Sequence, residues 1–291
     1  MDQQFYKSFN AKILLFGEHI VLHGAKALAI PLKSYSMEFQ HTAEVKLSDE
    51  VFEFFLQYLL SNKDFKLVEL YNRIVIEEYK SSIKSGLKIN STIPMNAGLG
   101  SSGAFIALFY EYFCKEKKHE ISALKKDLAL LESAFHGASS GIDPLVIYLG
   151  NAILMQQDHL ESINHSNIIV PLFCFNSNIK RNTQDCIRLF NNKLNDQEFK
   201  KNLNEKFIPM SNQIIENYLE LKEIGFLFKQ ISMFQFEYMK EFIPESIMIY
   251  WKQGLENNTY YLKLCGAGCG GFFLGYSVTE YPKNSQYLLL K

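Results

Sequence analysis

A glycine-rich turn at residues 94–104 constrains this chain more than any other segment. It reads Pro-Met-Asn-Ala-Gly-Leu-Gly-Ser-Ser-Gly-Ala and lies between apolar runs at 87–93 and 105–113. The pattern predicts a strand, a turn and a helix in direct succession. A glycine-rich turn that opens a helix directs unpaired backbone N–H groups and the positive helix end towards one point. Phosphate is the natural occupant, although an ordinary turn before a serine-capped helix has the same composition.

Two hydroxyl residues, Ser101 and Ser102, follow the second glycine of this turn. Their hydroxyl groups suit either a phosphate oxygen or a magnesium ion. The turn is not a Walker A loop, because no lysine follows the glycines at the required spacing. The sequence therefore predicts a phosphate site of a different kind.

Composition excludes several classes of protein. The 291 residues are 47% apolar and 21% charged, with a net charge of −1, which is an ordinary globular composition. The sequence has no basic patch for nucleic acid and no run of about 20 uncharged apolar residues for a membrane helix. Because the first ten residues lack the apolar core of a signal peptide, we expect a cytoplasmic protein. Five cysteines without a CxxC pair predict buried thiols rather than disulfides or a zinc site.

The hydrophobic pattern predicts a mixed α and β chain, long enough for two domains, with a mostly helical second half. A polar stretch at 158–167 is the expected domain boundary. The expected strands are 12–16, 20–22, 27–32, 36–47, 87–93, 151–156, 168–175, 260–264 and 272–276. The expected helices are 48–59, 64–79, 105–117, 122–137, 181–194, 196–207, 212–221, 226–242 and 244–256, and Ser122 is the expected cap of the fourth.

Polar residues interrupt the first apolar strand and the turn after it. Lys12 begins the strand, and Glu18 and His19 follow its end. A lysine at the start of a buried strand must find an anion or reach solvent, so an anion site and a surface lysine are the two interpretations.

Two further polar clusters lie later in the chain. Glu132 ends one expected helix, and Asp143 follows it in a loop rich in serine and glycine. Either carboxylate could bind a ligand or only cap a helix, with Pro144 as the first helical residue after Asp143. A second glycine-rich turn spans 266–271.

In order and spacing these clusters resemble the three signature motifs of the GHMP small-molecule kinases. The matching segments are 12–19 with Gly24, 94–102 and 263–268. Within that superfamily, Gly17-Glu18-His19 together with 136–137 and 139–143 is most similar to the mevalonate kinases. The resemblance implies an α+β fold of two domains. These would be a ribosomal S5 domain 2-like ATP-binding domain at 1–166 and a ferredoxin-like, helix-rich C-terminal domain at 167–291.

The resemblance also implies a role for individual residues. ATP and Mg²⁺ would be the cofactors, with Ser102 and Glu132 holding the metal. Asp143 would face the C5 hydroxyl of mevalonate with Lys12 beside it, as the two catalytic residues. The ATP-binding residues would be Pro94, Asn96, Ala97, Gly98, Leu99, Gly100, Ser101 and Ser102. The substrate-binding residues would be Glu18, His19, Thr183, Gly266, Ala267 and Gly268.

The expected reaction is transfer of the γ-phosphoryl group of ATP to mevalonate. Phosphoryl transfer passes through a loose transition state, so the protein mainly positions groups and neutralises charge. An ordinary aspartate would have to deprotonate an alcohol about 12 pKa units more basic, at a cost of roughly 16 kcal/mol. We therefore expect Asp143 to orient the hydroxyl and accept its proton late.

Other functions remain open at this stage. The alternatives are another GHMP kinase, acting on phosphomevalonate, a sugar or homoserine, and a GHMP-like protein that binds a ligand without catalysis. The expected partner is a small-molecule substrate, with no nucleic acid and no membrane, and the chain could form a homodimer.

The sequence departs from the family pattern at four positions. Gly103 stands where alanine is usual, and Pro144 where many mevalonate kinases have asparagine. Cys265 and Cys269 replace a threonine and a glycine of the third motif.

Overall fold

The structure is a computed structural model that describes residues 6–41, 50–61, 65–95, 97–157, 159–164, 171–180, 182–282 and 287–290. The chain divides into two compact units that alternate along the sequence. Unit 1 consists of residues 1–12, 31–94 and 100–150, and unit 2 of residues 13–30, 95–99 and 151–291. The expected domain boundary between residues 166 and 167 lies outside the described residues.

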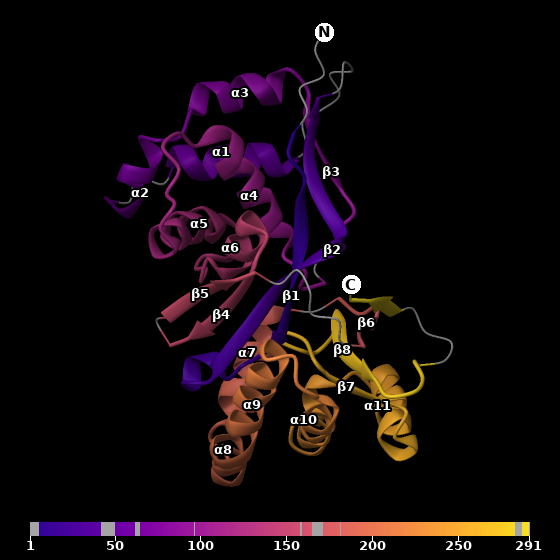
Figure 1. Cartoon of the computed structure of the whole chain (residues 1–291). Coiled ribbons are helices and arrows are strands. Elements are labelled where there is room, and N and C mark those ends of the chain that lie inside the picture. Colours follow the sequence, from indigo (N-terminus) through magenta and orange to yellow (C-terminus); the bar gives the residue numbers. More distant parts are fainter. Residues whose placement is uncertain are drawn as a thin grey trace. The chain divides into compact units, whose positions relative to one another are not determined.

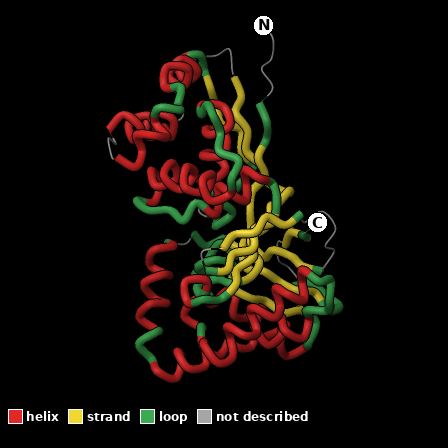
Figure 2. Tube along the Cα trace, turned by 60° about the vertical axis from the view of Figure 1, so that its left-hand side comes forward, coloured by secondary structure: helices red, strands yellow, loops and turns green. Residues whose placement is uncertain are grey.

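Unit 1 combines two strand segments with a set of helices. The C-terminal half of β2 (Lys26–His41) pairs antiparallel with β3 (Leu87–Ser91), and Met37 lies opposite Ser91. The helices lie on one side of these strands (Figures 1 and 2). They are α1 (Glu50–Ser61), α2 (Phe65–Tyr71), α3 (Ile76–Lys84), α4 (Ser101–Phe113), α5 (Ile121–His136) and α6 (Ile142–Leu149).

Aromatic side chains fill the core of unit 1. The Phe55 ring lies 4.8 Å from the Phe109 ring, and the Tyr79 ring lies 5.0 Å from Phe109, both at steep angles. Edge-to-face contacts of this kind stabilise a core beyond the burial of apolar area. Residues Gly103 to Tyr110 of α4 are all buried, so this helix forms the centre of the unit.

Unit 2 contains two groups of antiparallel strands. The second half of β1 (Phe9–Phe16) lies beside the first half of β2, which pairs with β4 (Ala152–Gln156), and β4 pairs with β5 (His159–Ile163). The second sheet has the order β7-β8-β6-β9, formed by Tyr260–Leu264, Phe272–Ser277, Leu172–Asn176 and Tyr287–Leu289. The helices are α7 (Thr183–Lys193), α8 (Gln197–Asn202), α9 (Ile208–Leu219), α10 (Gly225–Tyr238) and α11 (Glu245–Asn257), with a π-helical segment Leu203–Phe207 between α8 and α9.

The structure confirms most of the expected elements and corrects several. Residues 21–23 form a short 3-10 turn rather than a strand, because Gly24 closes it with a left-handed backbone. The expected helix at 64–79 is two helices, α2 and α3. Residues 159–163 of the polar stretch 158–167, which was expected to have no regular structure, form the strand β5.

One predicted helix cap, Ser122, is wrong, and the structure excludes the interpretation of Asp143 as a cap. Glu120, not Ser122, caps α5, and its carboxylate accepts the backbone N–H groups of Ser122 and Ala123. Helix α6 begins at Ile142 after Gly141, so Asp143 is a residue of its first turn and not its cap.

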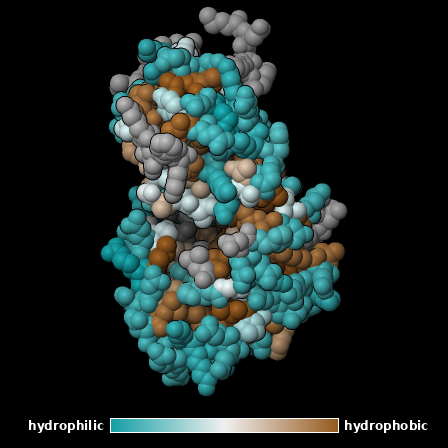
Figure 3. Space-filling view, turned by 90° about the vertical axis from the view of Figure 1, so that its left-hand side faces the viewer, coloured by the Kyte–Doolittle hydropathy of each residue, from teal (hydrophilic) through white to brown (hydrophobic). Residues whose placement is uncertain are grey.

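Figure 3 shows a face on which hydrophilic side chains dominate, interrupted by apolar patches. None of the helices among the described residues is both long and apolar enough to cross a membrane.

Candidate active site

The glycine-rich turn has the backbone that its sequence predicts. Gly98 and Gly100 have φ values of 82° and 79°, in the left-handed region that glycine adopts without strain. Helix α4 begins at Ser101, and Gly100, the residue before it, has no side chain with which to cap the helix. No side chain at position 100 therefore caps the first N–H groups of α4, and an anion site requires N–H groups without such a cap. Asn96 lies outside the described residues.

Gly100 also allows close contact with Lys12. A Cβ atom at Gly100 would lie 3.0 Å from Lys12 Cγ and 3.2 Å from Lys12 Cε. The turn thus packs directly on the aliphatic part of the lysine, and any larger residue would displace it.

Four side chains form the Glu132 cluster: Ser102, Glu132, His136 and Ser139. The Ser102 hydroxyl donates to Glu132 Oε1 at 3.0 Å, and the Ser139 hydroxyl donates to Glu132 Oε2. His136 Nε2 lies 3.1 Å from Ser102 Oγ. When the Ser102 hydroxyl donates to Glu132, the His136 tautomer protonated at Nε2 completes the contact by donating to Ser102 Oγ.

Glu132 is an unusual carboxylate, since only 4% of the residue is exposed. Burial, and then the charge of Asp143, raise the pKa of Glu132 to about 7, against the opposing effects of the two serine hydroxyls and Lys12. A buried carboxyl group with another carboxylate nearby is an environment that a cation would stabilise.

Lys12 and Asp143 form an ion pair. Lys12 Nζ lies 2.8 Å from Asp143 Oδ2, with 8% of the lysine side chain and 39% of the aspartate side chain exposed. This geometry excludes the interpretation of Lys12 as a surface lysine. Asp143 lies in the first turn of α6, where the helix dipole favours a negative charge.

Gly103 sets the distance between α4 and α6. A Cβ atom at Gly103 would lie 2.9 Å from the backbone nitrogen of Pro144 and 3.1 Å from the carbonyl carbon of Asp143. The glycine that departs from the family pattern therefore lets α4 pack on the backbone of Asp143 itself.

In unit 2, Glu18 lies in a buried cluster with Gln235 and Lys263, which we name the Lys263 cluster. Lys263 Nζ lies 2.8 Å from Glu18 Oε1, and Gln235 Nε2 donates to the same oxygen at 2.7 Å. Glu18 is 2% exposed and Lys263 is 1% exposed. Glu18 is thus paired with a lysine that sequence reasoning assigned no role.

His19 lies against the second glycine-rich turn. Its Nε2 is 3.0 Å from the carbonyl oxygen of Ala267, and its ring stacks on Phe190 with 4.5 Å between centroids. Gly266 and Gly268 have positive φ values, and so does Cys269, at 60°. The Cys269 N–H donates to the Phe242 carbonyl oxygen at 2.7 Å, which holds this residue in the left-handed conformation.

Comparison with known proteins finds similarity to GHMP kinases over part of the chain. Residues 66–151 match the model of the GHMP kinases N terminal domain. A mevalonate kinase of Pyrococcus abyssi is 31% identical over 174 residues, which cover 53% of this chain and 51% of that protein. Residues 66–151 of this chain therefore resemble the N-terminal domain of the GHMP kinases.

Solved structures of mevalonate kinases share the fold of this chain. The mevalonate kinase of Methanococcus jannaschii has a TM-score of 0.66 at 19% identity and covers 99% of this chain and 98% of its own. The L. major mevalonate kinase in complex with R-mevalonate has a TM-score of 0.64 at 17% identity, covering 95% of this chain and 88% of its own. The chain spans about half the length of the curated relatives it matches.

Three residues of these clusters were missed by sequence reasoning. His136 was quoted in the resemblance but given no role, and Gln235 gives no local signal because it lies inside an ordinary helix. Lys263 did give a signal: it interrupts the apolar strand Tyr260–Leu264, as Lys12 interrupts β1. The argument applied to Lys12 would have found it.

Thr183 is exposed at the first position of α7, and its role stays a prediction. The same helix contacts the second glycine-rich turn, because the Cys186 thiol lies 3.7 Å from the Gly268 carbonyl oxygen.

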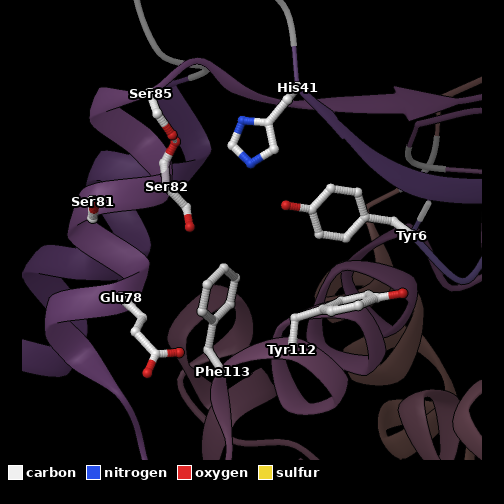
Figure 4. Close-up of a pocket in the computed structure, with 8 residues that line it drawn as sticks. All are labelled: Tyr6, His41, Glu78, Ser81, Ser82, Ser85, Tyr112 and Phe113. Carbon is white, nitrogen blue, oxygen red and sulfur yellow. Dashed lines mark hydrogen bonds between the residues drawn. The ribbon is translucent and has the colours of Figure 1, made fainter. Parts of the chain in front are cut away.

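Unit 1 also contains a cavity of about 310 Å³ (Figure 4). Tyr6, His41 and Phe113 line it, together with hydroxyl groups of α3 that include Ser82. None of the predicted site residues lines this cavity.

Proposed function

We propose that this chain is an ATP-dependent kinase that phosphorylates the C5 hydroxyl of mevalonate to give 5-phosphomevalonate. The observation that carries the proposal is the Lys12–Asp143 pair at 2.8 Å, in the same unit as the Ser102–Glu132 hydrogen bond at 3.0 Å. Similarity to relatives named as mevalonate kinases supports mevalonate as the acceptor.

Magnesium fits the chemistry of the Glu132 cluster. Ser102 and Glu132 offer a hydroxyl and a carboxylate oxygen, the donor types that Mg²⁺ prefers. Burial and the Asp143 charge, which raise the pKa of Glu132, are the conditions that a divalent cation relieves. Ser102 and Glu132 would hold the ion, which neutralises charge on the ATP phosphates when bound.

The other residues act by positioning and by charge. The backbone N–H groups of 98–101 would bind phosphate oxygens at the start of α4. Asp143 would accept a hydrogen bond from the C5 hydroxyl of mevalonate and take its proton late in the reaction. Lys12, held by Asp143, would stabilise the charge that develops on the attacking oxygen.

The first experiment measures ADP release by the purified chain with ATP and Mg²⁺. The four acceptors are mevalonate, phosphomevalonate, galactose and homoserine, and ³¹P NMR identifies the product. We expect turnover of mevalonate and a phosphate ester at its primary hydroxyl. Turnover of phosphomevalonate without mevalonate would contradict the proposed substrate. ATP binding without turnover of any acceptor would point to a non-catalytic protein.

Two variants test the proposed roles against matched controls. Asp143→Asn and Lys12→Met should each lower kcat by roughly 100-fold or more. Asp196→Asn is the control for the aspartate, because Asp196 also lies at the N-terminal end of a helix, as the cap of α8. Lys193→Met is the control for the lysine, because Lys193 pairs with Glu241 at 2.7 Å. Both controls should retain kcat, and near-normal turnover of the Asp143 or Lys12 variant would refute the assigned role.

A further inference from the structure

The Lys263 cluster places two opposite charges out of contact with water. Lys263 and Glu18 pair at 2.8 Å, and each side chain is 1% exposed. Removing both charges from water costs more than a simple ion pair returns, unless further hydrogen bonds compensate the loss. The cluster therefore needs an explanation beyond the attraction of two charges.

The hydrogen bonds of Lys263 tie three segments of unit 2 together. An ammonium group has three N–H donors. Besides Glu18, Lys263 Nζ lies 2.9 Å from the Leu15 carbonyl oxygen and 2.6 Å from the Leu264 carbonyl oxygen. The ammonium thus joins the end of β1, the turn after it and the end of β7.

Gln235 closes this network from α10. Its Nε2 donates to Glu18 Oε1 at 2.7 Å, and its Oε1 accepts the Leu264 N–H at 2.8 Å. Glu18 Oε2 is buried and has no hydrogen-bond partner among the described residues. This oxygen adds to the cost of burying the pair, because an unpaired buried oxygen is costly.

The segments that the cluster fixes are those that orient His19. His19 follows Glu18 directly and has a φ of 65°, in the left-handed region that costs energy for a residue other than glycine. Its Nε2 faces the carbonyl oxygen of Ala267, three residues after Leu264. A ring nitrogen that faces a carbonyl oxygen must carry the proton, so this contact also fixes the protonated nitrogen.

We propose that Lys263 is a positioning residue, which acts through Glu18 and Gln235 to hold the His19 imidazole in one orientation towards mevalonate. Glu18 is part of this support and does not contact the substrate, which replaces its expected role in substrate binding. The substrate in this inference rests on the proposed function, whereas the orientation of His19 rests on the contacts of unit 2 alone.

The test compares Lys263→Met with the double variant Lys263→Met/Glu18→Gln. The single variant leaves Glu18 charged, buried and unpaired, so its melting temperature should fall by several degrees. The double variant has no unpaired charge and should recover much of that loss. If the cluster positions His19, the double variant should still show a KM for mevalonate raised roughly 10- to 100-fold, with a smaller change in kcat.

A second readout needs no substrate. The ¹⁵N signals of the His19 imidazole are assigned with His19→Gln. They report whether Nε2 still carries the proton that it donates to the Ala267 carbonyl oxygen. We expect this signature to be lost in the double variant and weakened in Gln235→Met, which introduces no charge and provides a mild test if the double variant does not fold. A wild-type chain that does not phosphorylate mevalonate would refute the proposed function but leave the imidazole measurement valid.

Arg73→Met is the matched control. Arg73 pairs with Asp127 in a similarly buried site of unit 1, and it is not one of the proposed binding residues. It should lower the melting temperature without changing the KM for mevalonate or the His19 signals. Wild-type KM and wild-type His19 signals in both the double variant and Gln235→Met would overturn the proposal.

Discussion

Replacing Gly103 with alanine tests whether close packing of α4 on α6 sets the position of Asp143. The added Cβ atom would lie 2.9 Å from the Pro144 nitrogen, whereas ordinary contact begins at 3.4 Å. The two helices must therefore separate by about 0.5 Å, and the nearest atoms to move belong to the backbone of Asp143 and Pro144.

Two effects on stability oppose each other in this variant. Alanine is a better helix former than glycine by up to about 1 kcal/mol. Overpacking of a tight contact costs about 1–3 kcal/mol. The net loss of unfolding free energy is thus about 0–2 kcal/mol, too little to unfold the chain.

The effect on catalysis should be clearer. A misplacement of 1 Å in an active site can cost about 100-fold in rate, so a shift of half that size predicts a fall in kcat of about tenfold. This corresponds to about 1.4 kcal/mol of transition-state stabilisation.

The assay measures kcat at saturating mevalonate and ATP, together with the melting temperature. Gly254→Ala is the control, because Gly254 lies in α11 and a Cβ atom there would lie 2.5 Å from the Tyr260 carbonyl oxygen. It should be destabilised by overpacking and keep its kcat. A Gly103→Ala variant with normal kcat and a raised melting temperature would refute the reasoning, since the contact would then relax without moving Asp143.

Three further predictions concern buried or hydrogen-bonded groups of unit 1. The pKa of Glu132 is raised to about 7 in the folded chain from 4.5, so the metal-free protein should lose stability as the pH rises from about 4.5 to 7. Urea unfolding measures the free energy of unfolding of Glu132→Gln and of the wild type at pH 5 and at pH 8. The difference between the two proteins should shift by about 2–3 kcal/mol in favour of the variant from pH 5 to pH 8, and a difference that stays constant would contradict this. His136→Ala should raise the KM for Mg·ATP roughly 2- to 10-fold, and His136→Gln, which keeps a donor for Ser102, should restore it; equal effects would exclude a hydrogen-bonding role. Arg73→Met leaves Asp127 buried without its ion pair and should cost about 3–5 kcal/mol in chemical denaturation, so a loss below about 1 kcal/mol would show that the site accommodates the lone carboxylate.

Local patterns predicted the elements that carry the site. The glycines at 98 and 100 predicted a turn before a helix, and the structure has both features. Both glycines have the left-handed backbone that a residue without a side chain adopts easily. The glycine cluster at 266–271 follows a strand, as its sequence indicates. The backbone conformation at such positions depends on the absence of a side chain, and a glycine is visible in the sequence itself.

Elements without a strong local signal were missed. Strand β5 reads His-Leu-Glu-Ser-Ile, and its polar residues are typical of a loop; pairing with β4 makes it a strand. Glu120 caps α5 although glutamate is not among the preferred caps, because its carboxylate reaches two backbone N–H groups.

Contacts between residues that are far apart in the sequence could be found only from the resemblance or from the tertiary structure. The resemblance placed Lys12 beside Asp143, but no periodicity or spacing could have done so. The resemblance carried no partner for Glu18, so the contact with Lys263 came only from the structure. A lysine in a buried strand predicts that an anion lies beside it, but only the fold shows which residue supplies that anion.

The alternation of the two units along the chain has a consequence for synthesis on the ribosome. Lys26 of β2 pairs with Gln156 of β4, 130 positions later. At 5–20 residues per second, roughly 6–26 s pass between the emergence of these two strands. During that interval the apolar residues 27–30 have left the ribosome with β1 as a neighbour but without β4, while the last segment of unit 1 is still being made. The nascent chain therefore exposes one unpaired edge of β2 for many seconds, and an unpaired strand edge of this kind is open to aggregation or to chaperones until β4 is made.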